Sequence, residues 1–134
     1  MTSSHSLMSL DVGEKRIGVA IADSSVRIAI PYDTIEVDGN EINTIEKLIL
    51  SNKINILVVG YPRNQSGEAT NQTKFVEDFI AKINTDGLKL IFQDESLTSV
   101  TAEKRLIESG RKYTKGDIDK EAASIILQDY LEQN

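Results

Sequence analysis

The chain has 134 residues, of which 40% are hydrophobic and 27% are charged, a composition typical of one globular domain. The absence of Cys excludes a disulfide scaffold, a thiolate zinc site and a Cys nucleophile, and the single His, His5, argues against a Ser-His-Asp triad. The net charge of −6 argues against a broad basic face for nucleic acid, but it is compatible with a nuclease whose divalent metals neutralise a carboxylate cluster.

The start of the chain shows no targeting segment. No apolar run approaches the roughly 20 residues that span a bilayer. The first residues also lack the basic and then apolar order of a signal peptide. We therefore expect a cytoplasmic protein with a single domain over residues 1–134, flexible over residues 1–5.

The first third of the chain predicts three strands. Residues 6–10 and 16–22 are β-rich runs separated by a short break that contains Gly13, a pattern typical of a hairpin. The run 27–37 is rich in Ile but contains Pro31, which predicts an edge strand or a bulge.

The remainder of the chain alternates helices with strands. The order β-β-β-α-β-α-β-α-α predicts an α/β fold in which an antiparallel meander is followed by βαβ units, with helices on both faces of a mixed sheet. The elements expected after the meander are a helix capped by Asn40, a strand over 54–60, a helix that contains Phe75 to Ile83, a strand over 88–92, a short helix from Thr98 to Gly110 with Val100, Leu106 and Ile107 as its apolar residues, and a last helix from about Asp117 to Glu132.

Acidic residues follow two of the predicted strands, where functional sites gather in sheets of this kind. Asp11 ends the first strand, and Asp94 and Glu95 follow the strand 88–92. Taken one by one, Asp11 is better interpreted as a turn residue, and Asp94 and Glu95 are better interpreted as part of a solvated loop before a helix.

The last helix contributes two more carboxylates. Asp117 is interpreted as the N-cap. Asp119 lies on the stripe that continues through Ala122, Ala123 and Ile126, where the small alanines allow the helix to approach the sheet. A carboxylate on a core-facing stripe must be paired, hydrated or bound to a metal, and the structural and functional interpretations of Asp119 are equally supported.

In combination, Asp11, Glu95 and Asp119 are predicted to converge at one edge of the sheet, with Asp94 as the substitute for Glu95. Ligand sets made only of oxygen suit Mg²⁺ or Mn²⁺. Two such ions activate a water and stabilise the leaving oxygen of a phosphodiester without any histidine.

Basic residues lie beside the same positions. We predict that Lys15, Arg16, Arg63 and Lys115 contact phosphates, with solvated surface charge as the alternative. Arg111 and Lys112 also precede the last helix. For Tyr61 and Tyr113, packing is favoured over stacking on unpaired bases.

Four ordered motifs are spread over nearly the whole chain. They are residues 10–20 (Leu-Asp-Val-Gly-Glu-Lys-Arg-Ile-Gly-Val-Ala), 58–64 (Val-Val-Gly-Tyr-Pro-Arg-Asn), 94–103 (Asp-Glu-Ser-Leu-Thr-Ser-Val-Thr-Ala-Glu) and the stretch 115–128. Together they resemble the motifs of the YqgF family, bacterial proteins similar to Holliday-junction resolvases. Two positions depart from the family pattern: Tyr61 stands in place of Leu, and Ser96 in place of Arg removes a cation beside Glu95.

The resemblance implies an RNase H-like fold with a five-stranded sheet and a metal-dependent nuclease that matures the 5′ end of pre-16S ribosomal RNA. Two alternatives stay open. One is a Holliday-junction resolvase acting on branched DNA, for which a homodimer is expected because two strands are cut symmetrically. The other is a non-catalytic nucleic-acid-binding factor in transcription or ribosome assembly.

Overall fold

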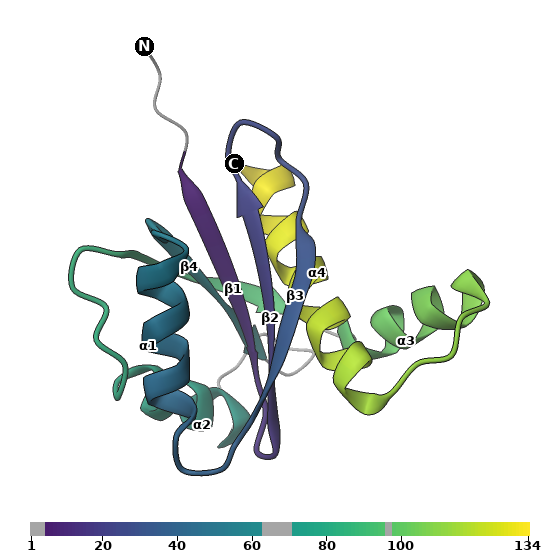
Figure 1. Cartoon of the computed structure of the whole chain (residues 1–134), viewed down its shortest axis with the longest axis horizontal. Helices are drawn as coiled ribbons and strands as arrows, with labels where there is room; N and C mark the ends of the chain where they lie inside the picture. The colour runs from purple at the N-terminus through teal and green to yellow at the C-terminus, as the bar shows by residue number, and fades with distance from the viewer. Residues whose placement is uncertain (1–4, 63–70, 96–97) are drawn as a thin grey trace.

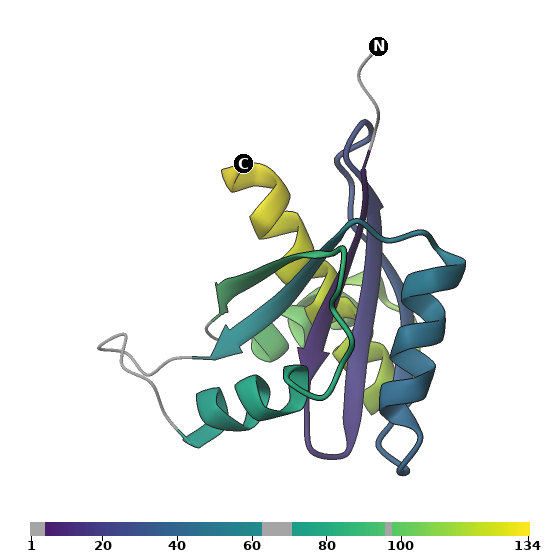
Figure 2. The same ribbon diagram turned by 90° about the vertical axis from the view of Figure 1, so that its left-hand side faces the viewer.

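The computed structural model describes residues 5–62, 71–95 and 98–134, which form a five-stranded mixed sheet with helices on both faces (Figures 1 and 2). The predicted element order is confirmed. Across these residues, no helix is long and apolar enough to cross a membrane. The strands are β1 (Ser6–Val12), β2 (Arg16–Asp23), β3 (Ile30–Glu36), β4 (Ile56–Pro62) and β5 (Lys89–Glu95), and the helices are α1 (Glu41–Ser51), α2 (Asn71–Ile80), α3 (Thr98–Ser109) and α4 (Lys115–Gln133).

The strands lie in the order β3-β2-β1-β4-β5. The β1–β2 hairpin and the β2–β3 pair are antiparallel, whereas β1–β4 and β4–β5 are parallel. The strand that contains Pro31 lies at an edge of the sheet, and its pairing shifts register between Val19 and Ala20, opposite Pro31. Both expectations for this proline are confirmed, because a residue without an N–H cannot continue an interior ladder.

Side chains of each strand alternate between two cores. Met8 and Leu10 of β1 pack against α1 and α2 in one cluster with Ile45 and Val76. Leu7 lies in the other cluster, with residues of α4. Figure 1 shows α1 and α2 on one side of the sheet and α4 on the other.

Close approach of backbone atoms seats α4 on the sheet. The Ser9 hydroxyl of β1 donates a hydrogen bond of 2.6 Å to the carbonyl oxygen of Ala123. A Cβ added at Gly18 of β2 would overlap the carbonyl oxygen of Asp119 and lie 3.0 Å from the amide nitrogen of Lys120. The missing side chain at Gly18 therefore lets the start of α4 lie directly on β2.

The start of α4 differs from the prediction. Thr114, not Asp117, is the N-cap, and Asp117 is the third residue of the helix. The Thr114 hydroxyl accepts a hydrogen bond from the Asp117 amide (3.2 Å), and the Asp117 carboxylate accepts one from the Thr114 amide (2.9 Å). This reciprocal capping box satisfies two backbone donors at once, which explains why the helix begins earlier than a single Asp cap predicts.

Two further details correct the sequence-based prediction. The helix expected through Ile83 ends at Ile80, although Ile83 stays buried in the core beyond the helix end. On α3, Val100 and Ile107 are exposed (64% and 60%). Among the α3 side chains that the structure describes, Ala102 is the buried one, because α3 packs on α4 rather than on the sheet and needs a small residue at the contact.

The capping box gives a first testable prediction. Thr114→Ala removes the oxygen that accepts from the Asp117 amide and is expected to destabilise the protein by about 1 kcal/mol in urea unfolding. Thr114→Ser keeps that oxygen and should retain wild-type stability. Equal losses in the two variants would show that the hydroxyl does not stabilise the helix.

Candidate active site

Asp11 lies near the carboxyl end of β1, on the face of the sheet that α4 covers. Its side chain points to the same face of the sheet as those of Leu7 and Ser9, which contact α4. In the β1–β2 register its partner is Gly18, the residue on which the start of α4 rests. The strand and the helix together therefore bring Asp11 close to the first turns of α4.

Asp119 completes this arrangement from α4. Its backbone lies over Gly18, and its side chain lines the same cleft as Asp11. The predicted carboxylates from the first strand and the last helix thus share one cavity. This cleft has a volume of about 240 Å³ and is lined by Asp11, Val12, Gly13, Arg16, Gly60, Pro62, Gln72, Val76 and Asp119.

The third predicted carboxylate belongs to the end of β5. The backbone of Glu95 pairs with Pro62, a residue that lines the cleft, while its side chain lies outside the described part of the structure. Asp94 is exposed and pairs with Tyr61. Its side chain points to the same face of β5 as that of Leu90, which packs in the core under α1 and α2. The backbone of β5 therefore places Glu95 at the margin of the cleft.

Arg16 makes the most direct contact within the cleft. Its Nε lies 2.6 Å from Oδ2 of Asp119, and the two side chains are 28% and 22% exposed. Arg16 is the first residue of β2 and shares the α4 side of the sheet with Gly18. A cation thus already lies on one of the three carboxylates that were predicted to bind metal.

Two of the other three predicted basic residues are described by the structure, and both are exposed. Lys15 is exposed in the turn of the β1–β2 hairpin, and Lys115 is exposed as the first residue of α4. Arg63 lies outside the described residues.

Asp117 is engaged in the cap and pairs with Lys120 (3.4 Å). The hydrogen bond from the Thr114 amide is the main cause that holds the pKa of Asp117 below its usual range.

The side chains described at this cleft fit a hard divalent cation in kind, because they offer carboxylate oxygens without sulfur or imidazole. Two carboxylate side chains, those of Asp11 and Asp119, line the cleft. Among the side chains that the structure describes, no three His, Cys, Asp or Glu residues are grouped to hold a metal. The third predicted ligand, Glu95, has its side chain outside the described part of the structure.

Gln72 is a cleft residue that the sequence analysis did not identify. It belongs to the first turn of α2, and the neighbouring Thr73 hydroxyl donates a hydrogen bond to the carbonyl oxygen of Pro62. This bond ties the start of α2 to the end of β4. The topology could have predicted this position, because the first turn of a helix that follows a parallel strand lies at the carboxyl edge of the sheet.

The two tyrosines considered for base stacking are engaged within the protein. Tyr61 donates a hydrogen bond to Glu77 (2.6 Å), and its ring meets that of Phe92 edge-on with centroids 5.1 Å apart. Tyr113 donates a hydrogen bond to Glu103 (3.0 Å), which raises the pKa of the phenol. Both contacts agree with the packing interpretation.

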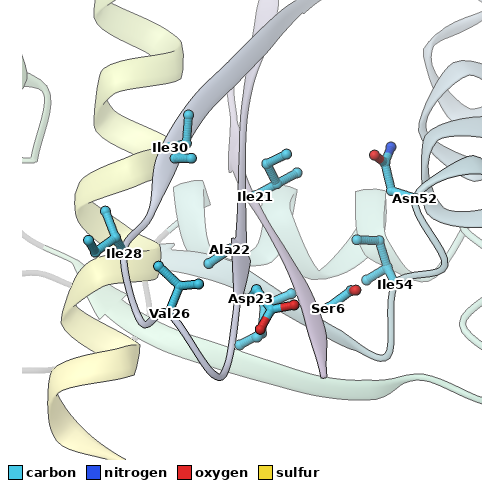
Figure 3. Close-up of a pocket in the computed structure, with 10 residues that line it drawn as sticks. Ser6, Ile21, Ala22, Asp23, Val26, Ile28, Ile30, Asn52 and Ile54 are labelled. Carbon is cyan, nitrogen blue, oxygen red and sulfur yellow. The ribbon is translucent and has the colours of Figure 1, made fainter. Parts of the chain in front are cut away.

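A separate apolar cleft of about 260 Å³ lies at the opposite end of β1 and β2 (Figure 3). Ile21, Val26, Ile28 and Ile30 form much of its wall, together with Ser6 at the start of β1. It shares no residue with the cleft of Asp11 and Asp119. The two clefts therefore lie at opposite ends of β1, and Asp23 is the carboxylate residue that lines the apolar one.

The fold is similar to that of two Holliday-junction resolvases of known structure. RuvC of T. thermophilus, in complex with a Holliday junction substrate, matches with a TM-score of 0.58 and 12% identity over 96% of this chain and 94% of that one. The Fowlpox virus resolvase, in complex with Holliday junction DNA, matches with a TM-score of 0.57 and 15% identity over 96% and 97%. The likeness confirms the expected α/β, RNase H-like fold with its mixed five-stranded sheet.

Sequence comparison identifies the family of the chain. The chain belongs to the RuvX family, whose model is described as "Holliday junction resolvase" and matches residues 5–133. A protein of Chloroflexus aurantiacus is 42% identical over 94% of this chain and 86% of its own length, and one of Synechocystis sp. is 39% identical over 98% and 90%. Both are named "Putative pre-16S rRNA nuclease", which confirms the resemblance to the YqgF family.

Proposed function

We propose that this protein is a metal-dependent nuclease that hydrolyses phosphodiesters in structured RNA and matures the 5′ end of pre-16S ribosomal RNA. The observation that carries the proposal is the cleft shared by Asp11 and Asp119, with the backbone of Glu95 at its margin. The names of relatives that match nearly the whole chain support the choice of substrate. Processing of ribosomal RNA implies work in the cytoplasm.

The three carboxylates have the role of holding Mg²⁺ or Mn²⁺. Asp11 is fixed by the β1 ladder, and Asp119 is fixed because the backbone of α4 rests on Gly18. Bound divalent ions supply an activated water and stabilise the leaving oxygen of the phosphodiester. The protein contributes negative charge at defined positions and needs no histidine, in agreement with the single His5 far from the cleft in sequence.

Arg16 has one role in the metal-free protein and another when metal and substrate are bound. Without metal, its guanidinium neutralises Asp119 at 2.6 Å and limits carboxylate repulsion in the cleft. A guanidinium also binds phosphate oxygens strongly, so Arg16 is placed to contact the substrate once Asp119 binds metal.

Arg16→Gln is therefore expected to shift two affinities in opposite directions. Mn²⁺ binding, measured by isothermal titration calorimetry, should become tighter by about tenfold, because a charge-assisted hydrogen bond of roughly 1.5–3 kcal/mol no longer competes for Asp119. RNA binding in Ca²⁺, measured by fluorescence anisotropy, should become weaker because a phosphate contact is lost.

Lys15→Gln is the matched control. It removes the same charge one residue away, from an exposed side chain in the hairpin turn. Its Mn²⁺ affinity should stay close to that of the wild type. Equal Mn²⁺ affinity in wild type and Arg16→Gln would mean that the ion pair does not compete with the metal.

A comparison of two substrates tests the proposed activity. Purified protein with Mn²⁺ is incubated with a pre-16S rRNA fragment that spans the 5′ end and, separately, with a four-way DNA junction. Cleavage of the RNA at a defined position is expected. Binding of RNA without cleavage of either substrate would contradict the proposal and identify a non-catalytic binding factor.

The second candidate is a Holliday-junction resolvase, which the description of the family model favours. Symmetrical cleavage of the DNA junction by a homodimer, with the RNA left intact, would establish it. Sedimentation of the protein on each substrate distinguishes a monomer from a homodimer.

A further inference from the structure

The positive charge of this acidic chain is concentrated in one segment. Residues 104–120 contain six of the 15 Lys and Arg residues but only three acidic residues, so the segment carries +3 within a chain of net charge −6. It comprises the second half of α3, the turn and the start of α4. Figure 1 shows this region standing out to the side of the sheet on which α4 packs.

A second polar cleft lies at this turn. Lys120 pairs with Asp117 (3.4 Å), and the nearby Arg105 pairs with Glu121 (3.5 Å). Arg111 and Lys112 are exposed, and no acidic side chain in the described part of the chain pairs with them. The cleft has a volume of about 360 Å³ and is lined by Pro31, Leu106, Arg111, Lys112, Tyr113, Asp117, Lys120 and Glu121.

The turn that presents these two cations is held from three sides. Tyr113 donates a hydrogen bond to Glu103 of α3, and Thr114 caps α4. The Thr34 hydroxyl of the edge strand β3 donates a hydrogen bond of 2.5 Å to the carbonyl oxygen of Gly116. A ligand of the turn therefore meets a backbone that is already ordered, which lowers the entropy cost of binding.

The turn lies beside the candidate active site along α4. Asp119 lines the cleft with Asp11, whereas Asp117, Lys120 and Glu121 line the cleft at the turn. Residues 117–121 of α4 thus contribute to both cavities, with Asp119 in one and its neighbours in the other. Successive residues of a helix lie about 100° apart, so the two cavities open on different sides of α4 near its first turns, and a polyanion that contacts both passes around this end of the helix.

We propose that the α3–α4 turn binds backbone phosphates of the nucleic-acid substrate beyond the cleavage position, through Arg111 and Lys112. The inference rests on the proposed function for the identity of the polyanion. Guanidinium and ammonium groups contact phosphates without reading sequence, so the turn positions the substrate rather than selecting a base. On a chain with net charge −6, such a local site provides attraction that the overall charge does not.

The test compares two double variants of equal net charge. Arg111→Ala/Lys112→Ala removes the proposed contacts, and Lys47→Ala/Lys82→Ala removes two exposed lysines on and near the helices that cover the other face of the sheet. Affinity for the labelled pre-rRNA fragment and for the four-way DNA junction is measured by anisotropy in Ca²⁺ at several salt concentrations.

Arg111→Ala/Lys112→Ala is expected to bind at least about tenfold more weakly than the control. Its slope of log affinity against log salt should be shallower by roughly 1.4 for single-stranded RNA and 1.8 for duplex DNA, as for two lost phosphate contacts. A loss of affinity on either substrate, with the change in slope, supports the inference. An affinity equal to that of the control on both substrates, or a loss without change in slope, would overturn the inference.

Mn²⁺-induced thermal stabilisation, measured in parallel, separates this inference from the proposed function. It should be the same in both double variants, because neither removes a carboxylate of the first cleft. If no form of the protein cleaves RNA but the loss of affinity occurs, the nuclease proposal fails and the phosphate-binding turn stands.

Discussion

Asp11→Asn is expected to abolish cleavage while the protein stays folded. The amide has the shape of the carboxylate but lacks the charge that a divalent metal requires. Loss of metal chemistry removes several kcal/mol of transition-state stabilisation, which corresponds to a rate lower by roughly 1000-fold or more. Because Asp11 and Asp119 share a cleft, the substitution also relieves carboxylate repulsion, and the metal-free variant should melt no lower than the wild type.

Thermal melting with and without Mn²⁺ checks this prediction independently of activity. At a concentration of about 100 times the dissociation constant, a metal that binds only the folded wild type adds about 2.7 kcal/mol of stability. Asp11→Asn should lose most of that gain. The control Asp86→Asn, in the exposed turn before β5, should keep it. Equal metal-induced stabilisation of wild type and Asp11→Asn would show that Asp11 is not a ligand.

Gly18→Ala is expected to cause a large loss of stability. The new methyl group would overlap the backbone of Asp119, and backbone atoms cannot rotate away as a side chain can. Overpacking of this kind costs about 3 kcal/mol or more. Relief requires α4 to move off β2, which also breaks the Ser9–Ala123 hydrogen bond and shifts Asp119 relative to Asp11.

Gly116→Ala provides the matched control, measured alongside it by urea unfolding. A Cβ at Gly116 would meet the Thr34 side chain at 3.6 Å, an ordinary contact, and alanine is the better helix former. This variant should be as stable as the wild type or slightly more stable. If Gly18→Ala unfolds within about 1 kcal/mol of the wild type, α4 does not rest on β2 as described.

The strands and the convergence of two carboxylates were predictable because their signals are local and periodic. Alternation in β1 places Asp11 on one face, and the stripe through Ala123 and Ile126 places Asp119 on the same side of the sheet. The prediction was wrong for Ala122, which packs against Ala102 of α3 and not against the sheet. Gly18 of the 10–20 motif has a physical role that no local pattern reveals. Gly18 is required by a backbone more than 100 positions away, and only the packed structure shows that contact.

The features that the sequence could not predict depend on partners distant along the chain. Arg16 was interpreted as a phosphate contact, but its partner in the structure is Asp119, 103 residues later. The apolar stripe expected on α3 was misleading, because α3 packs on α4 through Ala102 and leaves Val100 and Ile107 exposed. In each case the identity of the covering element decides the role of the residue.

The most direct test of the metal site is a crystal structure of the wild-type protein soaked in Mn²⁺, with the metal located by anomalous scattering. Peaks are expected between the carboxylates of Asp11, Glu95 and Asp119, at about 2.0–2.2 Å from their oxygens, with the Arg16 guanidinium displaced from Asp119. The account is contradicted if these carboxylates lie further apart than two metals can bridge, which is roughly 3.5–4 Å between the ions plus about 2 Å on each side. It is contradicted equally if the manganese binds elsewhere and Arg16 stays on Asp119.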